Sequence, residues 1–268
     1  AGSVRLGVDT GGTFTDLVLD DGRVVKVSST PDAPARAVRD AVDTVQERPA
    51  LLAHGTTVAT NALLEGRGGK VALLTTRGFA DVLEIARQTR PSLYDPHVDR
   101  PAPLVGRDLR LEVDGRLDGH GRELAPLDPA SVPAVPVGVD AVAVCLLHAD
   151  LDATHERTVA EALRQRGLDV TCSHDVSPEF REYERTVTTV ANALLRPVCR
   201  TYLRELDRLA DEVLVMTSGG GLLPVTEAAE LPAALLLSGP AGGVRAAAQV
   251  TAACGYPDAV SFDMGGTS

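Results

Sequence analysis

The chain carries one short glycine pattern, Asp-x-Gly-Gly-Thr, near its start and again at its end. The two copies occupy residues 9–13 and 263–267, and each follows a short β-branched or aromatic run, at 4–8 and 260–262, that predicts a strand. A glycine pair at a strand end can adopt positive φ and bring its N–H groups close to an anion that a side chain would block. The repeat therefore predicts two strand-end turns able to grip one phosphate chain.

A single Gly-Gly turn between two strands is commonly just a hairpin, so this prediction depends on the pair. After the first copy, residues 14–19 and 23–27 read as two further strands, joined by a turn at 20–22. The amino-terminal region is thus predicted to run as strand, phosphate turn, strand, turn and strand.

Beyond residue 27 the pattern alternates between helix and strand. Apolar residues spaced at i, i+4 predict a helix over 33–46, after a start signal at 29–32. The further predicted segments are strand 51–53, helix 57–64, strand 70–75, helix 79–85, strand 139–147, helix 153–166 and strand 169–172. This alternation predicts an α/β fold with a largely parallel core.

A proline-rich stretch from 90 to about 137 interrupts the alternation and is predicted to leave the core. Within it, residues 107–113 and 116–124 alternate polar and apolar side chains around Asp114-Gly115. That pattern predicts an exposed hairpin.

The carboxyl-terminal part contains two more glycine-rich turns. Ser177-Pro178-Glu179 predicts the start of a helix that reaches about residue 209, and a strand at 212–216 then runs into the turn 217–221. That turn fits a plain tight loop as well as a ligand contact. The other turn, 238–243, precedes a predicted helix over 244–254, and such helix starts bind anions. Glycine turns at one sheet edge suit a nucleotide cleft.

Composition excludes several classes of protein. The formal charge of −11 would repel a phosphate backbone, and 3% aromatic residues with no Trp give no platform on which bases could stack, so we expect no nucleic acid partner. The four cysteines have no Cys-x-x-Cys spacing. We find neither a membrane-length apolar run nor a signal peptide, and therefore expect no membrane partner and a cytoplasmic location.

Six strings together resemble the hydantoinase A and 5-oxoprolinase (N-methylhydantoinase) family. They are VDTGGTFTDLVL, HGTTVATNALLE, GFADVLEIARQTRPSLYD, SPEFREYERTVTTVANALL, SGPAGGV and FDMGGTS, in that order. The first and last alone would also fit the wider superfamily of actin, heat-shock chaperones and sugar kinases. The resemblance implies a ribonuclease-H-like ATPase domain with a mixed sheet over 4–176, with an insertion at about 90–137, and the start of the hydantoinase A main domain over 177–268.

The resemblance also implies an ATP-dependent hydrolase that phosphorylates the carbonyl oxygen of a cyclic amide such as a hydantoin or 5-oxoproline, with Mg²⁺ as a second cofactor. Asp9 and Asp263 are expected to attend the metal and to count among the catalytic residues. The residues expected to contact the nucleotide lie in the glycine-rich turns: Gly11, Gly12, Thr13, Thr15, Gly239, Gly242, Gly243, Gly265, Gly266 and Thr267.

Further candidates lie outside the glycine turns. Asp16 could orient a substrate or a water, with an exposed strand carboxylate as the alternative. His54 leads a segment that can present an imidazole, hydroxyls and an amide together, and a structural histidine is its alternative. The expected substrate-binding residues are Thr56, Thr57, Asn61, Arg87, Gln88 and Arg90, although the last three also fit a solvated helix end.

Family members continue beyond the second phosphate loop, so the second ATPase domain is expected to be incomplete in this chain. We expect the remainder to come from the same polypeptide or from a companion of the hydantoinase B type. Two other functions stay open: the nucleotide-binding subunit of an ATP-dependent ketone carboxylase, and a non-catalytic nucleotide-binding or assembly module.

Overall fold

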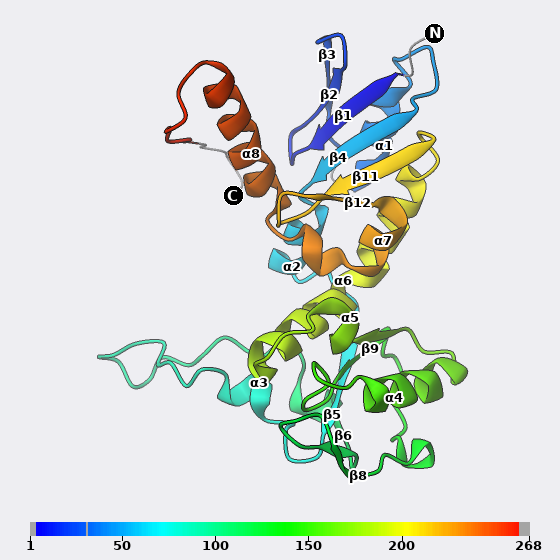
Figure 1. Cartoon of the computed structure of the whole chain (residues 1–268), viewed down its shortest axis with the longest axis vertical. Coiled ribbons are helices and arrows are strands. Elements are labelled where there is room, and N and C mark those ends of the chain that lie inside the picture. Colours follow the sequence, from blue (N-terminus) through cyan, green and yellow to red (C-terminus); the bar gives the residue numbers. More distant parts are fainter. Residues whose placement is uncertain (1–3, 31, 263–268) are drawn as a thin grey trace. The chain divides into compact units, whose positions relative to one another are not determined.

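The computed structural model describes residues 4–30 and 32–262 (Figure 1). They form two compact units, which we describe separately. Unit 1 takes in Ala1–Arg67 and Val198–Ser268, and unit 2 is the intervening stretch Gly68–Pro197. The boundary expected at 176/177 does not coincide with either limit between these units. It was drawn from the family resemblance, and it stays a prediction.

Unit 1 is built on a six-stranded mixed sheet with the order β12-β11-β4-β1-β2-β3 (Figure 1). β1, β2 and β3 are antiparallel neighbours, β4 and β11 join in parallel to β1, and β12 returns antiparallel to β11. The mixed sheet confirms the expected fold class. The strands are β1 (Arg5–Thr10), β2 (Phe14–Leu19), β3 (Val24–Ser28), β4 (Leu51–Thr56), β11 (Glu212–Met216) and β12 (Leu222–Pro224).

Alternation along the strands gives this sheet a closed face and an open face. Leu6, Val8 and Leu52 point to the closed face and are at most 3% exposed. The open face carries the intervening side chains, among them Asp9 and the 45%-exposed Val18. Polar groups on the open face are therefore accessible in unit 1, whereas polar groups on the closed face need internal partners.

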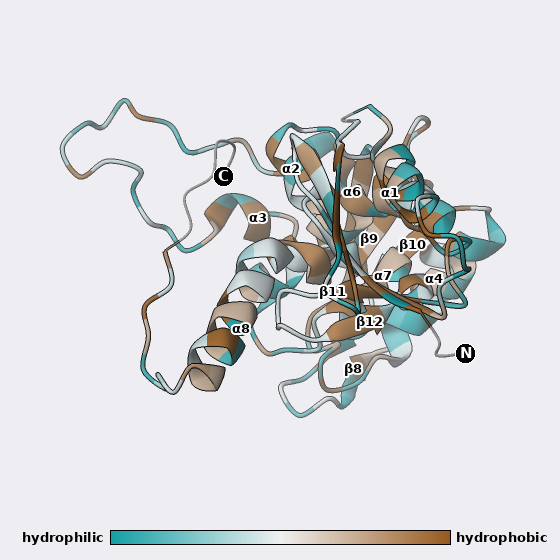
Figure 2. Cartoon of the chain, turned by 90° about the horizontal axis from the view of Figure 1, so that it is seen from above, coloured by the Kyte–Doolittle hydropathy of each residue, from teal (hydrophilic) through white to brown (hydrophobic). Residues whose placement is uncertain are grey.

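Helices complete unit 1. α1 packs against β1, β2 and β3, α7 packs against β11 and β12, and α8 contacts β4 and β11. α8 exposes Val244 and Val250, and apolar residues alternate with paler ones along it in Figure 2. The helices are α1 (Pro34–Val42), α2 (Val58–Leu64), α7 (Val225–Glu230) and α8 (Ser238–Ala253), with a 3-10 turn at Pro232–Leu235 and the final turns of α6 (Glu182–Leu206).

Unit 2 contains a four-stranded sheet of the order β10-β9-β5-β6 in which all neighbours are parallel. Its other elements are β5 (Val71–Thr76), α3 (Val82–Ile85), β6 (Arg110–Val113), β7 (Arg116–Leu117), β8 (Glu123–Ala125), β9 (Ala141–Cys145), α4 (Thr154–Gln165), β10 (Val170–Cys172), α5 (Ser173–Val176) and 3-10 turns at Arg107–Leu109 and Pro129–Ser131.

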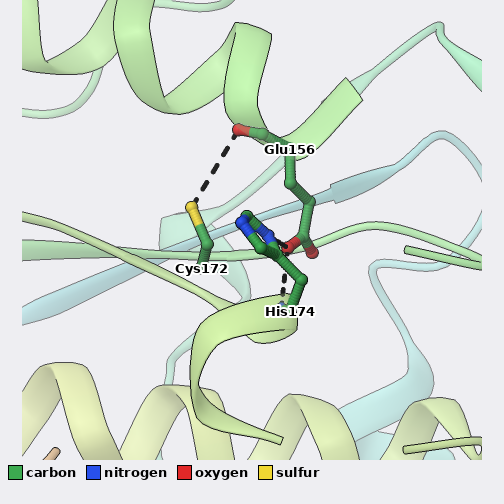
Figure 3. A group of neighbouring side chains, drawn as sticks. All are labelled: Glu156, Cys172 and His174. Atoms are coloured by element: carbon green, nitrogen blue, oxygen red, sulfur yellow. Dashed lines mark hydrogen bonds and ion pairs between the residues drawn. The ribbon is translucent and has the colours of Figure 1, made fainter. Parts of the chain in front are cut away.

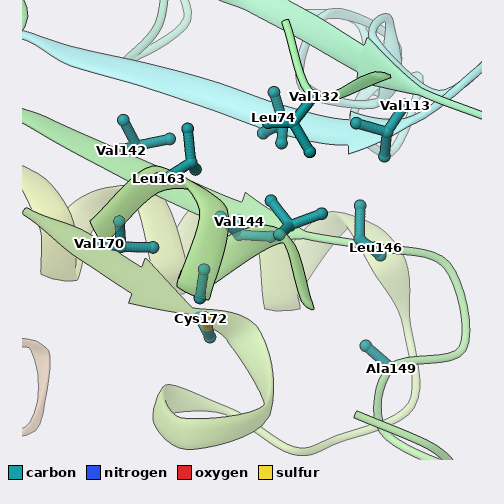
Figure 4. Close-up of a cluster of buried hydrophobic side chains, with 12 residues drawn as sticks. Leu74, Val113, Val132, Val142, Val144, Leu146, Ala149, Leu163, Val170 and Cys172 are labelled. Atoms are coloured by element: carbon teal, nitrogen blue, oxygen red, sulfur yellow. The ribbon is translucent and has the colours of Figure 1, made fainter. Parts of the chain in front are cut away.

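Strand β9 is buried on both faces, which explains its continuous apolar sequence. Val142 and Val144 lie in a cluster with Leu163 of α4 (Figure 4). Ala143 points the other way, into a second cluster that includes Val190 of α6. The expected buried strand is therefore confirmed.

The hairpin of the proline-rich stretch has different strands from those expected. β6 pairs with β5 and extends the parallel sheet, whereas β7 and β8 pair antiparallel with each other. β6 supplies the buried Val113 to the core, so burial outweighs pairing with its neighbour in sequence. No helix in the described stretches is both long and apolar enough to cross a membrane.

Three expected boundaries in the carboxyl-terminal part are wrong. The stretch after Ser177 is not helical: α5 ends at Val176, Arg181 has a φ of 96°, and α6 starts at Glu182. α8 begins at Ser238 rather than at 244, so the glycines expected in a loop form its first turns. Residues 260–262 are not a strand, because no described strand pairs with them.

Candidate functional site

The first glycine turn is a tight, pinned loop between β1 and β2. The Gly11 N–H donates to the Phe14 carbonyl at 3.0 Å, and the Gly11 carbonyl accepts from the Ser29 hydroxyl at 2.7 Å. The Ser29 hydroxyl also lies 3.1 Å from that of Thr15. The expected positive φ is wrong for both Gly11 and Gly12. A Cβ at Gly11 would lie 3.4 Å from the Phe14 carbonyl oxygen, which is an ordinary contact, so space alone does not require a glycine there.

The two threonines of the loop have different surroundings. Thr13 is exposed at the tip of the turn, whereas Thr15 is fully buried and its hydroxyl faces Ser29. Thr13 is therefore free to meet a ligand, and Thr15 is placed to hold the loop in shape.

Asp9 and Asp16 are direct cross-strand partners on the open face. Asp16 forms an ion pair with Lys26 at 2.8 Å. No hydrogen bond to the Asp9 carboxylate is recorded within the described part of the chain. Asp9 is exposed as a whole residue, but partial desolvation of its carboxylate, and then the nearby charge of Asp16, raise the pKa of Asp9 above its ordinary value. Two adjacent carboxylates of which one lacks a partner make a good donor set for a hard cation.

Gly55 makes room for this carboxylate. It is the register partner of Asp9 on β4, and a Cβ at Gly55 would lie 2.9 Å from Asp9 Oδ1. Real Cβ atoms essentially never come so close. A side chain at position 55 would therefore displace the Asp9 carboxylate.

His54 lies on the closed face, away from Asp9 and Asp16. It is 1% exposed, its Nδ1 lies 3.2 Å from the Val8 carbonyl, and its Nε2 lies 2.6 Å from the Tyr202 hydroxyl. Burial lowers the pKa of His54 to about 4, so the ring is neutral at physiological pH. The expected catalytic role would thus have to act through Tyr202.

A cavity of about 800 Å³ opens within unit 1 next to the first glycine turn. Its wall includes Gly11, Gly12, Ser29, Thr57, Asn61 and Tyr202. The structure therefore brings part of the expected nucleotide loop and part of the expected substrate segment to one space.

The segment after His54 builds one side of this cavity. Asn61 donates to the Thr57 hydroxyl at 3.3 Å, and that hydroxyl donates to the Thr10 carbonyl at 3.4 Å, which ties α2 to the end of β1. Thr56 is buried, and its hydroxyl accepts from the Val58 N–H at 3.2 Å. Thr57 and Asn61 border the cavity, whereas Thr56 is placed to start α2.

The expected anion-binding residues after helix α3 belong to unit 2. Arg87 donates to Glu184 at 2.7 Å, Gln88 has a φ of 55°, and Arg90 borders a separate groove of about 900 Å³. The Arg87 charge is thus already paired within unit 2, so that residue has a structural partner of its own.

The remaining expected contacts fall into two groups. Gly239 and Gly243 are exposed on α8, and a Cβ at Gly242 would lie 3.8 Å from the Met216 side chain. The second phosphate loop lies outside the described residues; its expected members are Asp263, Gly265, Gly266 and Thr267.

Unit 2 contains a buried carboxylate beside a thiol and an imidazole, at Glu156, Cys172 and His174 (Figure 3). Glu156 accepts hydrogen bonds from the Leu146 N–H at 2.9 Å, the Ser173 hydroxyl at 2.6 Å, and both the N–H and Nδ1 of His174 at 3.0 and 2.7 Å. The ligand atoms lie within 4.8 Å of one another, as a metal site would need.

Both Glu156 oxygens are nevertheless already used by donors, and burial raises the pKa of Cys172 to about 12, which keeps the thiol protonated. The cluster as it stands is an internal anchor between α4 and the β10–α5 connection. The spacing of the histidines in the sequence did not reveal it, because Glu156 comes from a separate element.

Sequence reasoning missed two residues of unit 1, Ser29 and Tyr202. Ser29 lies in the segment that we interpreted only as a helix start. Tyr202 lies on α6, and nothing in its local pattern distinguishes it from an ordinary core residue of an amphipathic helix.

Two family models match the chain: hydantoinase/oxoprolinase N-terminal region over residues 5–167 and hydantoinase/oxoprolinase over 185–268. The chain is 37% identical to caprolactamase subunit alpha of Pseudomonas jessenii, over 98% of this chain and 42% of that protein. It is 32% identical to 5-oxoprolinase 1 of Arabidopsis thaliana, over 100% of this chain and 25% of that protein.

Two solved structures are similar in fold. The crystal structure of the ATP-dependent caprolactamase from Pseudomonas jessenii gives a TM-score of 0.82 at 34% identity, over 94% of this chain and 41% of that one. A nucleotide-free acetone carboxylase gives 0.80 at 25% identity, over 95% and 41%. The chain thus spans less than half the length of these relatives. Since the family models cover most of its residues, the chain belongs to the hydantoinase/oxoprolinase family.

Proposed function

We propose that this protein is the nucleotide-binding part of an ATP-dependent hydrolase that phosphorylates the carbonyl oxygen of a cyclic amide. The observation that carries the proposal is the Asp9 carboxylate, which has no recorded partner in the described chain and a raised pKa, and lies at the strand end that leads into Gly11 and Gly12. The similarity to an ATP-dependent caprolactamase and to a 5-oxoprolinase supports the choice of a cyclic amide.

The chemistry explains why ATP would be used. Amide resonance makes the carbonyl carbon a poor electrophile. In the proposed reaction the carbonyl oxygen attacks the γ-phosphorus and ADP leaves. Water then adds to the activated carbon, and the ring nitrogen departs with a proton, which leaves an acyl phosphate. A second water releases phosphate and the open-chain amino acid.

Phosphoryl transfer requires mainly positioning and neutralisation of charge. In the proposal, the backbone N–H of Gly12 and the exposed hydroxyl of Thr13 bind phosphate oxygens at the open end of the loop. Ser29 and Thr15 hold that loop through the Gly11 carbonyl. A pinned loop loses little conformational freedom when the nucleotide binds, which favours affinity.

Asp9 fits Mg²⁺ by its donor chemistry, because a carboxylate with a raised pKa on the open face, beside a second carboxylate, gains from a hard cation. When bound, the ion would neutralise charge on the phosphates. We propose Asp263 as its second attendant and Gly265, Gly266 and Thr267 as the second phosphate grip, although these four residues lie outside the described part.

A screen of ATP hydrolysis tests the function. The complete protein, with any companion subunit it requires, is assayed with lactams and hydantoins, and separately with ketones plus bicarbonate. We expect cyclic amides to stimulate phosphate release and Asp9→Ala to abolish it, while Asp20→Ala, in the exposed β2–β3 turn, retains it. Stimulated turnover that survives Asp9→Ala would refute the assignment.

A ketone carboxylase is the second candidate, and the likeness to acetone carboxylase favours it. Such an enzyme would phosphorylate an enol oxygen with the same phosphate-binding loop and the same metal site at Asp9. Phosphate release that requires both ketone and bicarbonate identifies it.

The subunit designation of the caprolactamase relative supports a further proposal, that a companion chain, of the hydantoinase B type, completes the enzyme. Copurification of the native protein followed by mass spectrometry tests this. A cytoplasmic location stays a prediction.

A further inference from the structure

Tyr202 borders the cavity of unit 1, and its hydroxyl is hydrogen-bonded to His54 in a direction that the surrounding groups determine. The Val8 carbonyl can only accept, so His54 Nδ1 must carry a proton. Because burial keeps the ring neutral, its Nε2 has no proton and can only accept. The Tyr202 hydroxyl, 2.6 Å away, must therefore donate its proton to His54.

Because the Tyr202 proton is used in the bond to His54, the Tyr202 oxygen can only accept a hydrogen bond from any other group. Burial raises the pKa of Tyr202 well above its usual value, so the phenol stays neutral. The hydroxyls of Thr56 and Thr10 face the Tyr202 oxygen and lower that pKa in part. Thr10 Oγ1 itself is buried and has no hydrogen bond of normal geometry among the described residues. Tyr202 and Thr10 both border the cavity. The cavity wall thus includes a phenol whose proton is committed to His54, so that its oxygen can only accept, and a buried threonine hydroxyl without a partner among the described residues.

The charges around the cavity restrict its occupant further. Three carboxylates border it, at Asp32, Glu65 and Glu205, against one guanidinium, at Arg67. Arg67 is paired with Glu65, and Glu205 is paired with Arg39 at 3.4 Å. Among the described residues of the wall, no cation is free of a carboxylate, and Asp32 adds a negative charge. A ligand with its own carboxylate would be repelled.

We propose that this cavity binds the ring that is to be opened, and that it selects an uncharged ring whose amide N–H donates to the Tyr202 oxygen. The proposal rests on the proposed function, since it names the substrate class of that enzyme. Gly11 and Gly12 border the same cavity, so the ring would lie next to the loop assigned to the phosphates. His54 is then a positioning residue, which fixes the Tyr202 proton and does not meet the substrate.

Three small lactams test the two parts of the proposal separately and without a mutation: the preference for an uncharged ring, and the hydrogen bond from the amide N–H to Tyr202. 2-Pyrrolidinone and 5-oxoproline share one ring, but only 5-oxoproline carries a carboxylate, and N-methyl-2-pyrrolidinone lacks the N–H. On the complete protein, ligand-observed NMR titration without nucleotide measures binding, and lactam-stimulated ATP hydrolysis measures turnover. We expect 2-pyrrolidinone to bind about 10-fold more tightly than either analogue.

A substitution then locates the site. Tyr202→Phe removes the hydroxyl and should raise KM for 2-pyrrolidinone about 10-fold, with little change in kcat or in the affinity for Mg-ATP. It should also abolish the preference over the N-methyl analogue, which a merely structural role would not change. Tyr183→Phe, in unit 2, is the matched control and should behave as wild type.

The outcomes distinguish this inference from the proposed function. If 2-pyrrolidinone binds in the expected order but stimulates no turnover, the cavity assignment stands and the hydrolase proposal falls. If lactams are turned over while the N-methyl or carboxylate analogue binds equally well, or Tyr202→Phe leaves KM and the preference unchanged, the cavity assignment is overturned.

Discussion

Gly55→Ala tests whether the position of the Asp9 carboxylate matters for nucleotide binding. The added methyl would lie 2.9 Å from Asp9 Oδ1, whereas ordinary contacts begin at 3.4 Å. The carboxylate must therefore move by about 0.5 Å or rotate away. Because a misplacement of about 1 Å at a reacting centre costs about 100-fold, we expect a loss of about 10-fold in kcat/KM for Mg-ATP.

The fold itself should tolerate this change. The obstructing atom is the end of a side chain that can rotate, and Gly55 does not have a positive φ, so the free energy of unfolding should change by less than about 1 kcal/mol. Gly7→Ala is the matched control, because Gly7 lies on the open face of β1 together with Asp9, and a Cβ at Gly7 would meet no atom of the described residues within 4 Å.

The assay is a titration of Mg-ATP on the complete protein, read both as equilibrium affinity and as substrate-stimulated hydrolysis, alongside urea unfolding. If Gly55→Ala and Gly7→Ala behave alike in both readouts, Asp9 does not hold the metal.

Three further predictions concern stability. Asp9→Asn should raise the free energy of unfolding at pH 7. The reason is that a carboxyl group with a raised pKa makes the folded state less stable as the pH rises above the ordinary value of 3.8. Urea unfolding should show this gain shrinking toward pH 3, and an equal gain at both pH values would contradict the prediction. The hydrogen bond to Glu156 raises the pKa of His174, so the stability should be greatest below pH 6.5 and decline as the pH rises through the raised pKa. In pH-dependent urea unfolding, His174→Gln should remove that decline. A decline that persists in the variant would have another source and would contradict the prediction. Ser29→Ala should cost about 1–2 kcal/mol in thermal unfolding and weaken Mg-ATP binding, because the Gly11 carbonyl and the buried Thr15 hydroxyl lose their shared partner; unchanged nucleotide affinity would mean that the loop needs no such support.

Local pattern predicted β1, β2, β3, β4 and β11 of unit 1, because there the pattern and the burial agree, but it did not predict the short β12. β2 and β11 have the bounds expected from their sequences. α8 and α6 did not follow their local signals. The glycines at the start of α8 were interpreted as a loop, and Ser177-Pro178 as a helix start that the structure places before α6. β6 joins β5 through a long-range pairing that no local signal could reveal.

The candidate site was predictable where its residues are consecutive. Gly11, Gly12, Thr57 and Asn61 were named from the sequence and border one cavity. Tyr202 was not named, because its role depends on the buried ring of His54, with which it shares no local pattern. The sequence also placed Asp9 and His54 in one catalytic group, whereas the alternation of β1 and β4 puts them on opposite faces of the sheet.

A structure of the complete protein with Mg²⁺ and a non-hydrolysable ATP analogue tests the central claim most directly. The account predicts the γ-phosphate against the Gly12 N–H and the Thr13 hydroxyl, with the metal, or a water bound to it, on the Asp9 carboxylate. A triphosphate bound elsewhere, with Asp9 facing neither metal nor nucleotide, would contradict it.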